Sequence, residues 1–324
     1  MQFIGGLPIA IGIVLAALLS PPTAKGQTNL RLGHVTNPGS VYDQASKHFA
    51  GLINQKTAGQ IQIAVFPSGQ LGQERELIEG APLAIVDLFL VGVPSLTGVV
   101  PELGDSDLPF LYRDSAHAGK VLEGEVGAGW AKLLEVRGIK ALGWGAGGYR
   151  SIINNKKPVT QLEDFKGMKF RIAGGPVYLG LFRALGANAI QMTWSEVYGA
   201  MQQGVIDGLE APPNVLLNAK LHEVGKFVTL DEHTYSVLLF GMAMPSFNKL
   251  TPDQQRAIED AGKEAGRFMR DLADKLDLNA VADLQKAGIR VDKIDKAPLV
   301  TAMQPVYKEL AKNPAIVAKI QATH

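Results

Sequence analysis

The sequence predicts an α/β protein of two domains that are both crossed by one long helix. Between residues 30 and 93, strand and helix patterns alternate in the order β-α-β-α-β, which is typical of a mostly parallel sheet covered by helices. The same alternation starts again near residue 148. From Thr251 an apolar stripe at helical spacing continues for about 36 residues, roughly 54 Å, which is longer than one small domain.

The first half of the chain divides into strands and helices at clear signals. Ser40 can cap a helix, because its hydroxyl precedes apolar residues at helical spacing. A Gly/Pro-rich loop at 67–72 ends one strand and opens a helix near Glu74. We expect strands at 30–35, 60–66, 87–93 and 139–144, and helices after Ser40, near Glu74, at about 114–123 and at 125–137.

The second half carries three capping boxes, in which a threonine side chain and a glutamate or glutamine three residues later satisfy each other's backbone N–H groups. They begin at Thr160, Thr193 and Thr251, and Pro252 adds the first-turn proline of the long helix. We expect strands at 149–154, 169–172, 189–191, 207–210, 227–230 and 236–244, and helices at 177–185 and from 193. These elements predict domain I at 27–147 plus 237–276 and domain II at 148–236 plus 277–324.

The N-terminus predicts export from the cytoplasm. Residues 4–19 form an apolar run of signal-peptide length, shorter than a transmembrane helix requires. Small residues at Ala24 and Gly26 suit cleavage before Gln27, so we expect a signal peptide at 1–26 and a periplasmic protein. An uncleaved anchor is the alternative. No later segment is apolar enough to span a bilayer.

The composition excludes several classes of partner. Without Lys25 the remaining chain has 31 basic residues, which equal its 31 acidic residues, so its charge offers no footprint for nucleic acid. The chain has no cysteine and therefore relies on its core alone. Its six histidines show no spacing typical of metal ligands, and we expect neither a metal nor a cofactor. We expect a monomer.

A series of short motifs along the chain resembles the DctP-type solute-binding subunit of tripartite ATP-independent periplasmic (TRAP) transporters. The motifs appear in the family's order across nearly all of residues 27–324. They are Leu32–Val35, Phe66–Gly72 followed by Glu74–Glu76, Asp107–Leu111, Lys166–Arg171, Pro176–Tyr178, Leu185–Ala187, Ser195–Tyr198 and Gln203–Gly208.

The resemblance implies a two-domain periplasmic binding protein, type II-like, with crossing strands and a hinge cleft. In that family the protein captures an organic anion by closing, performs no chemistry, and delivers the anion to a membrane permease. The arginine of the Lys166–Arg171 segment holds the carboxylate. Two departures from the family pattern, Ala211 for an asparagine and Trp194 for a phenylalanine, predict an aromatic or branched 2-oxo or 2-hydroxy monocarboxylate as the ligand.

Eight residues are candidates for ligand binding. Arg171 is the first, because a guanidinium matches a carboxylate with two parallel hydrogen bonds. A structural ion pair with Glu163 or Asp164 is the alternative for it. Trp194 begins a capped helix, where anions are favoured, but it could equally be core packing. The other candidates, each also open to a packing, hinge or supporting ionic role, are Arg150, Glu210, Ser95, Asn214, Tyr149 and Tyr178.

Three other functions remain as alternatives. The run Gly143–Gly148 matches a dinucleotide-binding pattern, but that site needs a helix directly after the glycines, and a β-rich segment follows here. We therefore interpret the run as an interdomain crossing. An exported two-domain enzyme would need a nucleophile–base pair or a metal site, and the sequence shows neither. A binding protein serving a sensor kinase could have the same fold and pocket.

Overall fold

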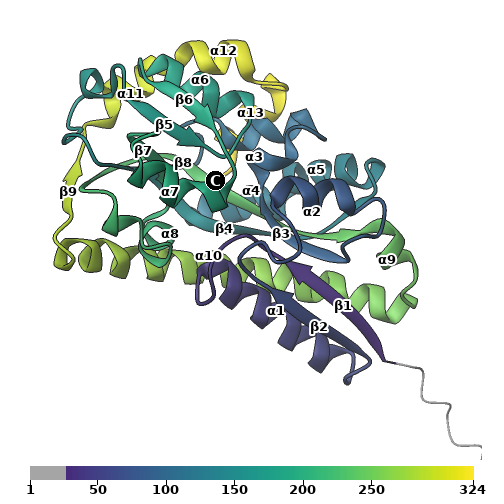
Figure 1. Cartoon of the computed structure of the whole chain (residues 1–324). Helices are drawn as coiled ribbons and strands as arrows, with labels where there is room; N and C mark the ends of the chain where they lie inside the picture. The colour runs from purple at the N-terminus through teal and green to yellow at the C-terminus, as the bar shows by residue number, and fades with distance from the viewer. Residues whose placement is uncertain (1–26) are drawn as a thin grey trace, which may run out of the picture.

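The computed structural model describes residues 27–324, and the predicted signal peptide lies outside them. A single mixed sheet runs through the whole molecule with helices on both faces (Figure 1). Its strand order is β2 (Ile61–Phe66), β1 (Thr28–Gly33), β3 (Leu88–Gly92), β8 (Phe227–Ala243), β4 (Ile139–Asn154), β7 (Gly208–Ala211), β5 (Lys169–Ile172) and β6 (Asn188–Gln191), and β9 (Arg290–Lys293) pairs with β8.

The helices follow the strands in the expected alternation. The α-helices are α1 (Val41–Lys56), α2 (Glu74–Gly80), α3 (Val93–Leu96), α4 (Ser115–Glu123), α5 (Glu125–Val136), α6 (Pro176–Ala184), α7 (Val197–Gln202), α8 (Pro213–Asn218), α9 (Met244–Asn248), α10 (Pro252–Lys286), α11 (Lys296–Ala302), α12 (Gln304–Leu310) and α13 (Pro314–Ala322). Short 3₁₀ helices are η1 (Pro101–Asp107), η2 (Leu162–Phe165), η3 (Trp194–Glu196) and η4 (Leu221–Glu223).

The two central strands, β4 and β8, pair antiparallel and connect the two halves of the sheet. Each is one continuous strand where the sequence predicts two, because the residues between the predicted strands stay extended and pair across the centre. On one side, β1 pairs parallel with β2 and β3; on the other, β5 pairs parallel with β6 and β7. The register of β4 and β8 shifts between Ala146 and Tyr149, where the expected domain boundary falls.

The long helix α10 crosses beneath both halves, as expected (Figure 1). Glycines allow it to lie directly against β4. A Cβ at Gly143 would lie 2.1 Å from the carbonyl oxygen of Gly262, and a Cβ at Gly266 would lie 2.5 Å from that of Trp144. The glycine run that matches a dinucleotide motif thus belongs to a strand, and its glycines serve close packing of a helix on a sheet.

Helix starts agree with the predicted caps, with one exception. Ser40 accepts the backbone N–H of Asp43, and the capping boxes beginning at Thr193 and Thr251 are both present. The box predicted at Thr160 lies one residue later, at Gln161 and Asp164. The reason is that the carboxylate of Asp164 accepts the backbone N–H groups of both Thr160 and Gln161, at 2.9 and 3.2 Å.

The C-terminal helices contact both halves of the molecule. Leu310 of α12 packs against Gly180 of α6, whereas the Nε2 of His117 in α4 donates to the carbonyl of Ile320 in α13, at 2.8 Å. Between these helices, the carboxylate of Asp105 accepts two successive backbone N–H groups at 312 and 313. The segment expected to belong to domain II therefore ends on elements of the other half.

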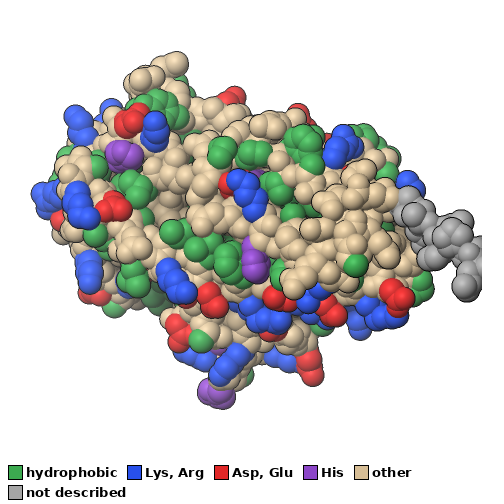
Figure 2. Space-filling view, turned by 90° about the horizontal axis from the view of Figure 1, so that it is seen from below, with side chains coloured by type: hydrophobic (Ala, Val, Ile, Leu, Met, Phe, Trp, Pro, Cys, Tyr) green, Lys and Arg blue, Asp and Glu red, His purple; other side chains and the backbone are tan. Residues whose placement is uncertain are grey.

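On the face seen in Figure 2, Lys and Arg side chains lie among Asp and Glu side chains and form no patch of one sign. Within the part of the chain that the structure describes, no helix combines the length and apolar character required to cross a bilayer.

Candidate functional site

A cleft opens where the carboxyl ends of parallel strands from the two halves of the sheet meet. An outer cleft of about 1070 Å³ leads to a small inner chamber of about 50 Å³. The chamber is lined by residues that follow β1, β3 and β5, namely Val35, Pro94 and Ala173, and by Ala211 at the end of β7. In open α/β sheets, ligands bind at such a meeting of strand ends.

Arg171 lies on β5 and lines both the cleft and the chamber. It is only 3% exposed, and its Nε and Nη2 donate to the carbonyl oxygen of Met192, at 3.0 and 2.9 Å. Its Nη1 donates to no group among residues 27–324, and no carboxylate in that range lies within ion-pair distance. Burial lowers the pKa of Arg171 to about 10. The guanidinium is thus a buried cation without an anion.

The structure does not show the ion pair considered for Arg171, whereas Trp194 lines the cleft and also packs against the hydrophobic core. Asp164 pairs with Lys157 at 3.6 Å, and Arg171 pairs with neither Glu163 nor Asp164. Trp194 is partly exposed and lines the cleft, and its ring lies 5.5 Å from the guanidinium carbon of Arg171. The indole therefore covers one side of the cation while leaving it open to the cleft.

Arg150 lines the chamber but is already paired. Its Nη2 donates to Oε1 and to the carbonyl oxygen of Glu210, at 2.9 and 2.8 Å, its Nε also donates to that carboxylate, and its Nη1 donates to Ser236. Burial alone would lower the pKa of Arg150, but the charge of Glu210 outweighs burial and raises it. Glu210 is fully buried behind Arg150. It holds this arginine in place through the ion pair, which is the supporting role considered for it from the sequence.

A bulge in β8 adds two more charged residues to this group. Arg150 pairs with Thr234 and Ile152 with Thr229, so four residues of β8 oppose one of β4. The bulge turns His233 inward, where its Nδ1 lies 2.9 Å from Asp231 and its Nε2 lies 3.5 Å from Glu210. Bulges commonly redirect side chains next to functional sites. No local pattern in the sequence predicts this contact, because it depends on the bulge.

The other candidates divide between the cleft and the rest of the fold. Ser95 lines the outer cleft and donates to Glu74. Asn214 instead donates to Gly147 and Asp277, at 2.8 and 2.6 Å, and ties β4 to α10. Its side chain lines neither the cleft nor the chamber.

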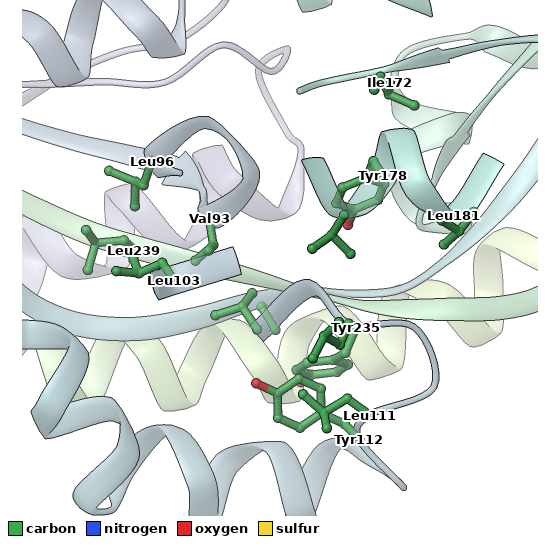
Figure 3. Packing of buried hydrophobic residues seen from close by; sticks show 14 of the residues in the cluster. Val93, Leu96, Leu103, Leu111, Tyr112, Ile172, Tyr178, Leu181, Tyr235 and Leu239 are labelled. Carbon is green, nitrogen blue, oxygen red and sulfur yellow. The ribbon is translucent and has the colours of Figure 1, made fainter. Parts of the chain in front are cut away.

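The two tyrosines lie behind the cleft. Tyr178 is 1% exposed, and its ring lies 5.6 Å from the guanidinium carbon of Arg150. Tyr149 precedes Arg150 on β4 and faces the opposite way, as alternation along a strand requires. Its ring packs on Tyr235, with ring centroids 5.0 Å apart. In Figure 3, Tyr178 and the pair Tyr112 and Tyr235 lie on opposite sides of the crossing strands.

Glu74 is the cleft residue that the sequence analysis missed. It lines both the cleft and the chamber, and its Oε1 accepts the backbone N–H of Gly92 at 2.9 Å. Burial raises the pKa of Glu74, and the bonds from Ser95 and Gly92 and the charges of Arg171 and Arg150 oppose that rise. A signal was present: Glu74 follows the loop after a predicted parallel strand, which is where such sheets place ligand contacts.

Known proteins share the sequence pattern and the fold of this chain. The family model DctP, described as bacterial extracellular solute-binding protein, family 7, matches residues 32–313. The 2,3-diketo-L-gulonate-binding periplasmic protein YiaO of Escherichia coli is 34% identical over 263 residues, covering 81% of this chain and 80% of that protein.

Two solved structures show the same architecture. A TRAP periplasmic solute-binding protein from Bordetella superposes with a TM-score of 0.90 at 34% identity, covering 92% of this chain and 100% of the other. One from Polaromonas sp. JS666 superposes with a TM-score of 0.88 at 30% identity, covering 92% and 99%. These relatives are transport proteins that bind solutes, not enzymes. The chain therefore belongs to the DctP family of TRAP-transporter solute-binding proteins.

Proposed function

We propose that this protein captures an organic acid whose carboxylate binds the guanidinium of Arg171, and that it does so without chemistry. The observation that carries the proposal is a cation 3% exposed, with no carboxylate partner among residues 27–324, at the wall of the cleft of about 1070 Å³. A buried charge is costly unless it is paired. A ligand carboxylate would supply the missing charge and accept from the free Nη1.

The two walls of the cleft belong to different halves of the sheet, so a movement of the halves would close the cleft around a ligand. Glu74 and Ser95 come from one half of the sheet, and Arg171 and Trp194 come from the other. An anion that contacts both walls only when they are close together favours the closed form by its differential affinity. We propose that β4 and β8 form the hinge, that the domain boundaries lie near 147 and 236, and that the loaded monomer delivers its ligand to a TRAP permease in the periplasm.

The chamber wall supports a ligand with an apolar body. Ala211 and Trp194 both line it, and neither offers a carboxylate or an amide. We propose a branched or aromatic 2-hydroxy or 2-oxo monocarboxylate. The Bordetella protein has density interpreted as pantoate, which is a branched 2-hydroxy monocarboxylate. The Polaromonas protein holds D-erythronate, so a short sugar acid is the second candidate.

A ligand screen tests the proposal directly. Tight ligands raise Tm by mass action, so we expect shifts from pantoate or related 2-hydroxy acids and none from neutral sugars. Calorimetry should then show that Arg171→Ala loses at least about two orders of magnitude in affinity. Arg183→Ala is the matched control, because it removes an arginine from the exposed face of α6. Unchanged binding by folded Arg171→Ala would refute the proposal.

A further inference from the structure

Two residues outside the cleft connect the wall of the inner chamber to the crossing strands. Three residues of the segment 211–215 line the chamber, namely Ala211, Pro212 and Val215. Asn214 belongs to the same segment, but its Nδ2 donates to the carbonyl oxygen of Gly147 in β4 and to Oδ1 of Asp277 in α10, at 2.8 and 2.6 Å. Its backbone N–H donates to the same oxygen of Asp277, at 2.9 Å. One asparagine thus joins the chamber wall, a crossing strand and the long helix.

The carbonyl that Asn214 holds lies at the irregular point of β4. Between Ala146 and Tyr149, this strand has one residue more than the strand it pairs with. Gly148 there has a φ of +107°, a conformation that favours glycine. A Cβ on Gly148 would overlap Oδ2 of Asp277 and would lie 3.4 Å from the Cβ of Pro212. The carboxylate and the chamber wall therefore enclose the same glycine of the proposed hinge.

The fold holds the carboxylate of Asp277 without a counterion. It forms no ion pair with any cation among residues 27–324. Burial raises the pKa of Asp277 to about 7; the bonds from Asn214 oppose that rise, and the charges of Asp274 and Glu232 add to it. The other titratable groups of this region have partners of their own, and they are Tyr235, Lys296 and Arg270. A buried charge that the fold does not compensate is typical of functional positions.

We infer that Asp277 and Asn214 form a hinge latch that positions the chamber wall for the ligand, and that the latch holds the wall most firmly when Asp277 is ionised. The inference rests on the proposed function and adds to it a pair of positioning residues that do not touch the ligand. The latch acts through the segment 211–215, because this segment lines the chamber on one side and is bonded to the hinge on the other.

The sign of the pH dependence follows from the hydrogen bonds. Above a pH of about 7, Asp277 is ionised, and an ionised acceptor forms stronger hydrogen bonds with the two N–H groups of Asn214 than a neutral carboxyl group does. Below that pH the bonds weaken and the wall is less ordered before the ligand binds. Ordering a wall on binding lowers the affinity. The affinity for the ligand therefore rises with pH.

Calorimetry on the mature protein at pH 6, 7 and 8 tests the effect on binding. The probe is pantoate, or D-erythronate if the ligand screen selects it, because both acids are ionised over this range. We expect the affinity of the unmodified protein to rise by about threefold to tenfold from pH 6 to pH 8. Asp277→Asn keeps the shape without the charge, so its affinity should stay near the value of the unmodified protein at pH 6.

The matched control is Asp260→Asn, which removes an exposed carboxylate from the same helix and should keep the rise. Asp277→Asn is expected to fold, because it removes a charge that burial disfavours. A rise in Asp277→Asn equal to that of the unmodified protein would overturn the inference.

Hydrogen exchange on the ligand-free mature protein follows the latch whatever the ligand is. After correction for the intrinsic exchange rate, the amides of 211–215 should become more protected from pH 6 to pH 8 in the unmodified protein but not in Asp277→Asn. Asn214→Ala should also lose this change, although it retains Asp277. Protection that is independent of pH in the unmodified protein would refute the latch.

Arg171→Ala separates the latch from the proposed function. It should lose binding but keep the exchange profile of the unmodified protein, because Arg171 forms no bond with the latch. If Arg171→Ala binds normally while the exchange profile depends on Asp277, the proposed function fails and the latch stands.

Discussion

The buried charges behind the chamber form a row in which cations and anions alternate. Arg150 donates to Glu210, Glu210 lies beside His233, and His233 lies beside Asp231. Each member is nearly fully buried, so removing one leaves a neighbour uncompensated, which typically costs about 3–5 kcal/mol. The row holds the guanidinium of Arg150 against the chamber wall. The four residues together have a net charge of zero when His233 is protonated.

His233 makes stability depend on pH. Burial would lower the pKa of His233, but Asp231 and Glu210 outweigh burial and raise it to about 9. A raised histidine pKa stabilises the fold fully below the unfolded value near 6.5, and this contribution is lost as pH rises through about 9. We expect the free energy of unfolding to fall over that window by at most about 3 kcal/mol.

Urea unfolding between pH 6 and 10 measures this effect. Asp277, whose pKa burial raises to about 7, titrates in the same window. The comparison with His233→Gln removes that background, because both proteins retain Asp277. The variant should show a flatter pH dependence than the unmodified protein. Parallel curves would mean that His233 has no raised pKa.

At the scale of elements, the contact between α10 and the crossing strand β4 depends on glycines, which have no side chain to hold the two backbones apart. Gly262 and Gly266 on the helix and Gly143 on the strand let the two backbones touch. The charged outer face of the helix adds little, because exposed ion pairs contribute about 0–1 kcal/mol each. The position of the long helix is therefore set by the buried glycines.

Gly266→Ala should weaken this contact. The added methyl would lie 2.5 Å from the carbonyl oxygen of Trp144, so the helix must shift, and we expect a loss of about 1–3 kcal/mol. Gly51→Ala in α1 is the control, since nothing lies within 4 Å of the added atom. That change should stabilise the helix by about 0.5–1 kcal/mol. Urea unfolding measures both, and equal effects at the two sites would contradict the packing argument.

At the scale of the whole molecule, crossing chain segments connect the halves. The strands β4 and β8 cross between them, α10 lies beneath both, and the C-terminal segment leads from α12 on one half to α13 on the other. The walls of the cleft also approach each other, since a Cβ at Gly175 would lie 3.4 Å from Oγ1 of Thr97 and 3.6 Å from the carbonyl oxygen of Pro94. This arrangement permits closure about the crossing strands, a common form of hinge motion.

Ligand binding should therefore make the molecule more compact. We expect the radius of gyration from small-angle X-ray scattering to decrease when a saturating 2-hydroxy acid is added, because only the closed form lets one ligand contact both walls. Arg171→Ala at the same ligand concentration should show no decrease. A ligand that binds tightly without changing the scattering would show that the cleft is already closed.

Much of the fold could be predicted because its signals are local. The cap at Ser40, the box at Thr251 and the strand at 169–172 each depend on residues within a few positions, and the structure confirms them. Arg171 could be proposed for the same reason, since a short motif places it at a strand end. The family also followed from the order of short motifs.

The tertiary structure alone decided which distant side chains meet. Glu74 lies opposite Arg171, and His233 beside Glu210, because of the strand order and one bulge, which local periodicity does not encode. Asn214 pairs with α10 for the same reason. The sequence by itself determined most elements up to the long helix, the family, and the cation of the proposed site. Only the folded sheet places Glu74 opposite Arg171, because contacts between residues far apart in the sequence depend on strand order and register.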